Sequence, residues 1–200
     1  MSNRKLLSLL IIWLILFNLF ISCDLFTTRE PETPTGSSSG GRQFPRDPQT
    51  VMDNLVDAVG RRSSVDYMYI FSPDEDDSAR FEFIPDPESV RSFPGRFDNW
   101  DLKQEERFSA TLFAAATTPL DSIAFLEIIV DRETVIGDSA QTSVQYDLRI
   151  GHLREGAPRQ MSGRMDIEMV KGDDGSWTMR RWIDVRLAGS SCWSDLKAHF

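Results

Sequence analysis

The stretch that decides the fold is Val144–Ile150, VQYDLRI, in which every second residue is apolar or aromatic. Strict alternation is typical of a β-strand with one buried and one solvated face. Val144, Tyr146 and Leu148 therefore share one face with Ile150, and Gln145, Asp147 and Arg149 share the other. The stretch predicts a long strand whose apolar side chains face a core.

Similar runs lie on both sides of this strand. Towards the C-terminus, the next run places Met161, Met165, Ile167 and Met169 opposite Arg164, Asp166 and Glu168. Residues 172–175, GDDG, predict a hairpin turn. The last run places Trp177, Met179, Ile183, Val185 and Leu187 on its inner face, with a bulge at residues 180–182 because Arg181 would otherwise point inward. Towards the N-terminus, residues 123–130 are apolar on both faces and predict a strand covered on both sides.

Helical patterns come before this meander. Residues 48–59 have apolar residues at helical spacing, and Ser63 or Ser64 can cap a second short helix that continues to Phe71. Residues 79–84 alternate as a strand that ends at Pro85. Residues 101–117 predict the clearest helix, with a capping box formed by Asp101 and Gln104. Residues 192–197 predict a short helix or an ordered tail packed through Trp193 and Leu196.

The expected order is α-α-β-α-β-β-β-β, an α+β fold in which a curved antiparallel sheet wraps around helices as a cone. Residues 51–55, the entry to the third helix at residues 99–101, and Trp177 followed by residues 181–184 resemble the nuclear transport factor 2-like superfamily, with its cystatin-like fold. The resemblance covers residues 48–200. This superfamily includes ketosteroid isomerase-like and polyketide cyclase-like enzymes as well as plain binding domains, so the likeness implies a fold and not one activity.

The N-terminus resembles a bacterial lipoprotein signal peptide. Arg4 and Lys5 precede an apolar run over residues 6–21, and Ser22 precedes Cys23. The resemblance implies cleavage after residue 22 and acyl chains such as palmitate on Cys23, which anchor the protein to the extracytoplasmic side of the inner or outer membrane. An uncleaved signal anchor and an ordinary secretory peptide are the alternatives. Residues 23–47 are rich in Thr, Pro, Ser and Gly and predict a disordered linker to a domain over residues 48–200.

Cysteine count and charge restrict the partners. The chain has two cysteines, so Cys192 has no intramolecular partner if Cys23 is acylated and can pair with it if Cys23 is free. We interpret Cys192 as a buried apolar residue and not as a nucleophile. The formal net charge is −9, and loss of Arg4 and Lys5 with the leader makes it more negative. Nucleic acid and anionic lipid headgroups are therefore excluded as partners, because both need a basic surface.

The interior of the cone is the expected place for a ligand. Its inward polar candidates are Tyr67, Tyr146, His152 and Asp184, of which Tyr146 and Asp184 are the catalytic candidates. The resemblance implies a proton shuttle and hydrogen-bond donors there, but Tyr146 can equally close the core while Asp184 pairs with an arginine. A pocket for a flat apolar molecule would be lined by Tyr67, Phe113, Tyr146, Met165, Trp177 and Asp184.

No cofactor or metal is expected. The two histidines are isolated in sequence, and residues 74–77, DEDD, lack the ligand spacing of a calcium loop. Three hypotheses follow for function. The first is a lipid-anchored binding domain without catalysis, the second an isomerase-like or cyclase-like enzyme acting on a small apolar molecule, and the third a structural homodimer of the cell envelope.

Overall fold

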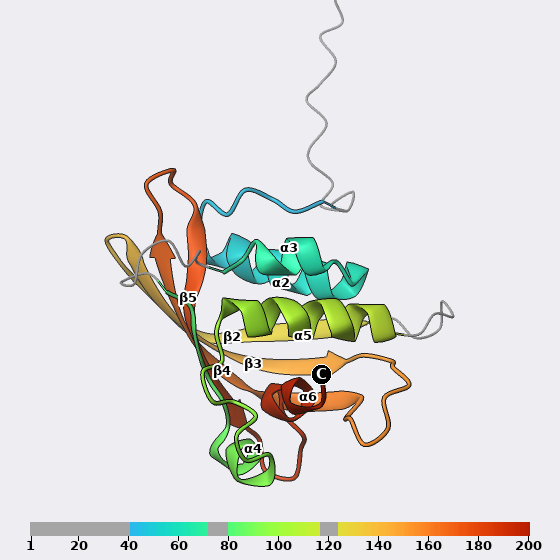
Figure 1. The fold of residues 1–200 in the computed structure, drawn as a ribbon. Coiled ribbons are helices and arrows are strands. Elements are labelled where there is room, and N and C mark those ends of the chain that lie inside the picture. The colour runs from blue at the N-terminus through green and yellow to red at the C-terminus, as the bar shows by residue number, and fades with distance from the viewer. Residues whose placement is uncertain (1–40, 72–79, 117–123) are drawn as a thin grey trace, which may run out of the picture. The chain divides into compact units, whose positions relative to one another are not determined.

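The computed structural model describes residues 41–71, 80–116 and 124–200, which form one α+β domain (Figure 1). The leader, Cys23, most of the expected linker and the acidic run at residues 74–77 lie outside the described residues. None of the described helices is long and apolar enough to cross a membrane. In chain order the elements are α2 (Pro48–Arg61), α3 (Ser64–Met68), β1 (Glu82–Ile84), α4 (Pro87–Ser92), α5 (Leu102–Ala115), β2 (Phe125–Ile136), β3 (Ser139–Arg149), β4 (Gln160–Lys171), β5 (Trp177–Arg186) and α6 (Trp193–His199).

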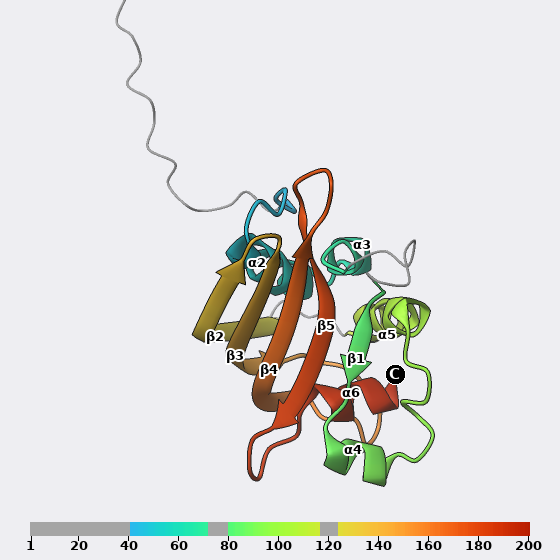
Figure 2. The ribbon, with the colours of Figure 1, turned by 90° about the vertical axis from the view of Figure 1, so that its left-hand side faces the viewer.

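The strands form one five-stranded sheet in the order β1-β5-β4-β3-β2. Strands β2 to β5 are an antiparallel meander as predicted, whereas β1 pairs in parallel with β5. The helices lie on one face of the curved sheet, and Figure 2 shows the other face towards the viewer. The predicted curved sheet packed against helices is therefore confirmed.

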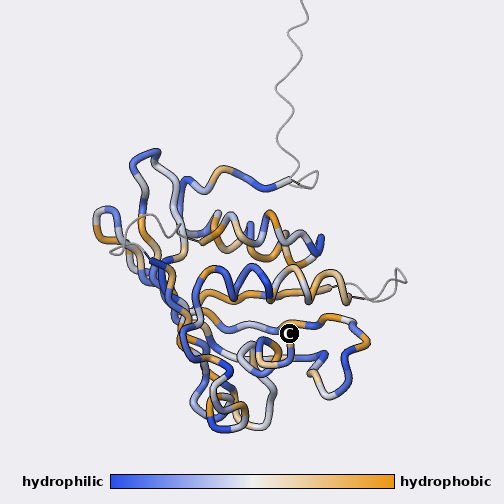
Figure 3. The backbone as a smooth tube through the Cα atoms, in the orientation of Figure 1, coloured by the Kyte–Doolittle hydropathy of each residue, from blue (hydrophilic) through white to orange (hydrophobic). Residues whose placement is uncertain are grey.

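The alternation that decided the fold is present in β3 and β4. In β3, residues 140, 142, 144, 146 and 148 are buried, and in β4 the odd residues 161–169 are buried. Figure 3 shows the mixture of hydrophobic and hydrophilic positions along these strands. Tyr146 lies opposite Gly163, where an added Cβ would come within 2.5 Å of the tyrosine oxygen. A glycine is needed at residue 163 because the phenol ring of Tyr146 occupies the space above it.

The predicted bulge in β5 is confirmed, but the prediction of which residues face inward after the bulge is wrong. Glu168 pairs with Arg181 while Met169 pairs with Met179, so Arg180 is the extra residue. The extra residue shifts the alternation by one, and the buried residues after it are Trp182 and Asp184. The expectation that residues 183, 185 and 187 face inward is therefore wrong, because it continued the alternation without the shift.

Strand β2 is also exposed where the sequence predicted burial on both faces. Of its twelve residues only Leu126 is buried. Strand β2 stands at the end of the sheet, where only one of its edges is paired among the described residues. The apolar run therefore predicted the strand correctly, but the predicted burial of both faces is wrong. The position of β2 at the end of the sheet leaves most of its side chains exposed to solvent.

Short polar side chains set the helix starts. Asp47 accepts a hydrogen bond from the backbone N–H of Thr50, and Ser63 and Asp101 cap α3 and α5 in the same way. For α5 the bond from the backbone N–H of Gln104 to Asp101 is present at 2.9 Å, which is the first half of the expected capping box. Helix α4 was not predicted, although Asp86 caps it and Pro87 occupies its first turn. The predicted C-terminal helix is confirmed as α6.

The last residues of the expected linker are bonded to the domain. The backbone of Gln43 exchanges two hydrogen bonds of 2.8 Å with the side chain of Asn54 in α2. The carbonyl oxygen of Pro45 accepts a bond of 2.8 Å from the backbone N–H of Trp177 at the start of β5. Residues 43–45 therefore belong to the folded unit.

Candidate functional site

The first buried polar cluster is centred on Glu105, in the first turn of α5. Its carboxylate accepts hydrogen bonds from the Tyr67 hydroxyl at 2.6 Å, from the Trp100 indole N–H at 2.7 Å and from the Lys197 ammonium at 2.7 Å. The Glu105 and Lys197 side chains are both completely buried. The ion pair joins α5 to α6, and Tyr67 adds α3, so three helices meet at one carboxylate.

Aromatic rings enclose the ammonium group of Lys197. Its nitrogen lies 3.6 Å from the ring centre of Phe83 and 4.3 Å from that of Trp182, and the rings of Trp100 and Phe108 lie at 5.5 Å. Ring faces attract a cation, and the attraction is stronger away from water. The surroundings of Lys197 thus compensate part of the cost of burying its charge.

Burial governs the protonation of this cluster. It lowers the pKa of Lys197, and the neighbouring Glu105 carboxylate opposes that change. Burial also raises the pKa of Tyr67 well above its usual value, and Glu105 adds to this rise. Tyr67 is therefore a neutral hydrogen-bond donor at physiological pH.

The second cluster joins the two catalytic candidates. The Tyr146 hydroxyl donates to one carboxylate oxygen of Asp184 at 2.8 Å and accepts a bond from the Trp193 backbone N–H at 2.8 Å. The other Asp184 oxygen accepts bonds of 2.6 Å from the backbone N–H and the hydroxyl of Ser194. The expectation that Asp184 pairs with an arginine is wrong. Its carboxylate accepts hydrogen bonds from two hydroxyl groups and one backbone amide instead.

Burial shifts the pKa of both members of this dyad upward. Burial raises the pKa of Asp184, although the hydrogen bonds from Ser194 and Tyr146 work against the rise. Burial raises the pKa of Tyr146 well above its usual value, and the nearby Asp184 raises it further. A carboxyl group with a raised pKa beside a tyrosine can carry acid–base chemistry, but only if a substrate reaches it.

A third cluster lies around Arg186, where β5 meets α4 and α6. Its guanidinium group donates to Asp195 at 2.7 Å, to Ser89 at 3.0 Å and to Asp86 at 3.2 Å. Burial acts to raise the pKa of Asp195, but the hydrogen bonds from Arg186 and Ser89 outweigh it and the pKa is lowered. Burial raises the pKa of the Cys192 thiol to about 12, so the buried thiol predicted from the sequence is a poor nucleophile.

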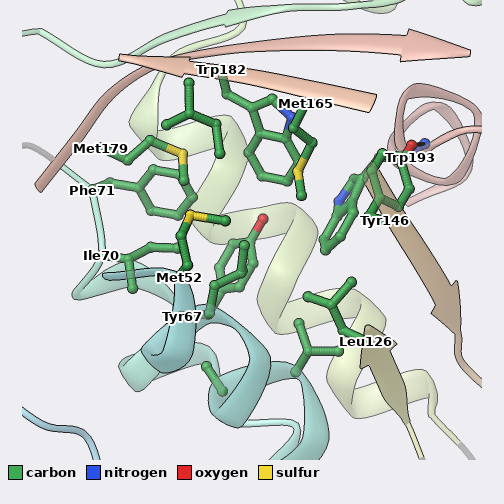
Figure 4. Packing of buried hydrophobic residues seen from close by; sticks show 14 of the residues in the cluster. Met52, Tyr67, Ile70, Phe71, Leu126, Tyr146, Met165, Met179, Trp182 and Trp193 are labelled. Atoms are coloured by element: carbon green, nitrogen blue, oxygen red, sulfur yellow. Dashed lines mark hydrogen bonds between the residues drawn. The ribbon is translucent and has the colours of Figure 1, made fainter. Parts of the chain in front are cut away.

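The predicted pocket residues lie inside the packed core. Figure 4 shows Tyr67, Tyr146 and Met165 among the neighbouring side chains of the core. The exposed fractions of the six are 0% for Tyr67, 9% for Phe113, 2% for Tyr146, 0% for Met165, 4% for Trp177 and 1% for Asp184. His152 is also buried, and its Nε2 lies 2.9 Å from the carbonyl oxygen of Pro158. The structure joins Tyr146 to Asp184, and it bonds Tyr67 to Glu105 in the separate first cluster.

Sequence reasoning missed Glu105 and Lys197. A signal was present, since Glu105 stands three residues before Phe108 and seven before Leu112 on the apolar side of its helix. Lys197 directly follows the buried Leu196 and stands four residues after Trp193. A charged residue on the apolar face of each of two helices is a pattern that predicts a buried ion pair.

Surface cavities lie around the sheet in the part of the chain that the structure describes. One of about 580 Å³ is lined mainly by outward residues of β2, β3 and β4, and one of about 350 Å³ lies between the other end of β2–β3 and residues 187–190. The third, of about 360 Å³, is lined by Arg80, Phe81, Glu82, Asn99, Trp100, Arg180 and Arg181, and we call it the arginine pocket. Tyr146 is part of the lining of the cavity of about 350 Å³, whereas Glu105, Asp184 and Lys197 line none of the three. Within residues 41–71, 80–116 and 124–200 no group of three or more His, Cys, Asp or Glu residues is placed to hold a metal ion.

Comparison with solved structures identifies the fold. No protein-family model and no curated protein matches the sequence. A conserved protein from Planctomyces limnophilus is similar in structure, with a TM-score of 0.52 and 13% sequence identity over 70% of this chain and 94% of that chain. An NTF2-like family protein from Streptomyces avermitilis has a TM-score of 0.50 and 10% identity over 70% of this chain and 94% of that chain. At these identities the likeness shows the nuclear transport factor 2-like fold alone, as predicted from the sequence.

Proposed function

We propose that the chain is a lipid-anchored binding domain without catalysis in its interior, and that it binds a small organic anion in the arginine pocket. The observation that carries the proposal is that the ionisable groups of the interior are buried and bonded to one another or to neighbouring side chains. Glu105 and Lys197 are 0% exposed and Asp184 is 1% exposed, and each is hydrogen bonded to other side chains. A proton shuttle must come within hydrogen-bond distance of its substrate, and these groups have no open space beside them.

The arginine pocket supports an anionic ligand. Arg80 and Arg180 are exposed, and neither has an ion-pair partner among the residues that the structure describes. Arg181 is paired with Glu82 at 3.1 Å and with Glu168 at 3.4 Å, so its charge is already compensated. The pocket thus offers two available guanidinium groups on a chain whose net charge is −9. Guanidinium groups bind carboxylates and phosphates through two parallel hydrogen bonds.

The shape of the pocket adds an apolar requirement. Trp100 forms part of its wall while the indole N–H of the same residue is bonded inward to Glu105. Arg180, the extra residue of the β-bulge, lines the pocket together with Arg181, and bulges commonly re-aim side chains at functional sites. A volume of about 360 Å³ lies at the small end of ligand sites. The matching ligand is a carboxylate or phosphate monoester that carries a flat apolar group.

Titration with phenyl phosphate tests this ligand class. We expect saturable binding by the full chain in detergent, measured by the change in tryptophan fluorescence, and weaker binding of inorganic phosphate, which lacks the ring. Replacing Arg80 and Arg180 with alanine should weaken phenyl phosphate binding by about 100-fold, since each charge-assisted bond contributes 1.5–3 kcal/mol. Arg149→Ala, which changes an exposed arginine outside the pocket, is the matched control. Equal affinity in all three proteins would contradict the proposed site.

The anchor needs its own experiment. We expect the mature protein to begin at Cys23 and to carry diacylglyceryl and fatty acyl groups, detected by the mass of the N-terminal peptide from membranes. Cys23→Ser should give a chain that keeps its leader or lacks the acyl groups, because the peptidase and the acyl transfer both use that cysteine. A native chain that still begins at Met1 with a free thiol at Cys23 would refute the anchor, whatever phenyl phosphate binding shows.

A further inference from the structure

The free edge of β2 is unusually apolar for a strand at the end of a sheet. Ten large hydrophobic side chains are exposed among the described residues, and half of them lie on β2. Their exposed fractions are 46% for Phe125, 58% for Ile129, 39% for Val130, 48% for Val135 and 76% for Ile136. Within the part of the chain that the structure describes, no strand pairs with the outer edge of β2. Long apolar edges invite pairing, and proteins that stay monomeric usually protect them.

We propose that β2 pairs in an antiparallel manner with β2 of a second copy of the chain, across a twofold axis. The two five-stranded sheets then form one continuous sheet of ten strands. This interface uses the edge of the sheet, and it is independent of the arginine pocket, which lies on the side of β1 and β5. A twofold interface needs one self-complementary surface, and β2 supplies it.

The register with β3 assigns each β2 residue to a face. Residues that pair with the buried positions of β3 face the helices, and these are Leu126, Ile128, Val130, Glu133 and Val135. The residues that alternate with them face outward, namely Phe125, Glu127, Ile129, Arg132, Thr134 and Ile136. The change of parity comes from the bulge between Val130 and Arg132.

This face assignment favours one pairing. When Ile129 lies opposite Arg132 of the second copy, the two bulges lie opposite each other. On both sides of the bulges, helix-facing residues then lie opposite helix-facing residues, and outward-facing residues lie opposite outward-facing ones. Phe125 then lies opposite Ile136, and Leu126 lies opposite Val135, so both ends of the interface are apolar on both faces. The exposed apolar residues at the two ends of β2 thus cover each other.

Charge complementarity selects a second copy as the occupant. In the same pairing Arg132 lies diagonally beside Glu127 of the other copy on the outer face, and the twofold axis repeats this contact. Strand β2 carries Glu127, Asp131 and Glu133 against one Arg132, and the two Arg132–Glu127 contacts offset the approach of the two Asp131 residues at the axis. The alternating apolar and oppositely charged residues are a surface that complements itself.

Disulfide trapping in membranes that contain the full chain tests the pairing. Glu127 lies opposite Thr134 of the other copy, so we expect Glu127→Cys/Thr134→Cys to form a disulfide-linked dimer under mild oxidation. Glu127→Cys/Ile136→Cys, which is shifted by two residues, should remain largely monomeric, as should the parent chain with its buried Cys192. A dimer in the shifted variant, no dimer in either variant, or a link to a different protein would overturn the proposal.

A charge exchange gives a second readout that does not depend on cysteines. Arg132→Glu should weaken dimerisation about tenfold in detergent, measured by sedimentation, because two attractive contacts become repulsive. Glu127→Arg/Arg132→Glu restores opposite charges and should return the dissociation constant to within about twofold of the parent value. If the double variant is as weak as the single one, the proposed register is wrong.

Discussion

The ion pair between Lys197 and Glu105 gives the sharpest test of the energetics of this core. Lys197→Met keeps most of the side-chain volume but removes the cation that lies 2.7 Å from the carboxylate. Removing one partner of a buried pair usually costs about 3–5 kcal/mol, because the other charge is left without compensation. Glu105 keeps the hydrogen bonds from Tyr67 at 2.6 Å and Trp100 at 2.7 Å, so we expect a loss near the lower limit, about 3 kcal/mol.

A matched double variant separates the charge from the packing. Lys197→Met/Glu105→Gln removes both charges and keeps an acceptor for Tyr67 or Trp100. Replacement of a whole buried pair is often neutral, so the double variant should come within about 1 kcal/mol of the native stability. The pair would then contribute to the arrangement of three helices more than to the free energy of unfolding.

Urea unfolding followed by tryptophan fluorescence measures these differences directly, since the rings of Trp182 and Trp100 lie 4.3 Å and 5.5 Å from the Lys197 nitrogen. The pKa of Lys197 is lowered in the folded state by burial, so the unfolded state binds more protons below the usual lysine value of about 10.4. Native stability relative to the double variant should therefore rise as the pH increases through the lowered pKa of Lys197 towards the usual lysine value. A single-variant loss below about 1 kcal/mol, or a double variant as unstable as the single one, would refute the reasoning.

Three further outcomes follow from the packing. Gly163→Ala should destabilise the fold by about 1–3 kcal/mol, which would lower the urea midpoint. The added Cβ would come within 2.5 Å of the Tyr146 hydroxyl oxygen, which is hydrogen bonded to Asp184. An unchanged midpoint would show that the Tyr146 ring can move. Cys192, with a pKa of about 12, should react with a thiol reagent at pH 8 only after denaturation; rapid labelling of the folded chain would contradict its burial. Asp47→Ala should cost about 1 kcal/mol through loss of the 2.7 Å cap bond to the Thr50 backbone, whereas Asp47→Ser should retain most of the stability.

The fold was predictable where local pattern and tertiary position agree. The alternation in Val144–Ile150 and in the methionine-rich run after it predicted β3 and β4 correctly, because both strands lie inside the sheet. The same reasoning failed at β2, since the sequence carries no mark that this strand would stand at the edge. It also failed after the bulge in β5, where one extra residue, Arg180, exchanged the two faces of every residue that follows.

The candidate site was predictable in part. Tyr146 and Asp184 were predicted to be inward polar residues. The structure places the Tyr146 hydroxyl 2.8 Å from a carboxylate oxygen of Asp184, although the two residues are 38 positions apart in sequence. Their hydrogen-bond partners, Trp193 and Ser194, could not be predicted, because the contact depends on how the last helix packs against the sheet. Glu105 and Lys197 escaped selection since a charged residue in an amphipathic helix is ordinarily solvated, and only the neighbouring helices show that these two are not.

Helix α6 explains why the binding function is proposed for the surface. Its residues Trp193, Leu196 and Lys197 are at most 1% exposed, so they fill the space on the concave side of the sheet. The same helix supplies the bonds that satisfy the interior acids, through Ser194 to Asp184 and through Lys197 to Glu105. A ligand in the interior would have to displace an aromatic side chain and also break the bonds that Ser194 and Lys197 make to the two buried carboxyl groups, and each loss costs on the order of several kcal/mol. Exposed groups such as Arg80, Arg180 and the edge of β2 carry no such cost, and within the part of the chain that the structure describes no ion pair or strand occupies them.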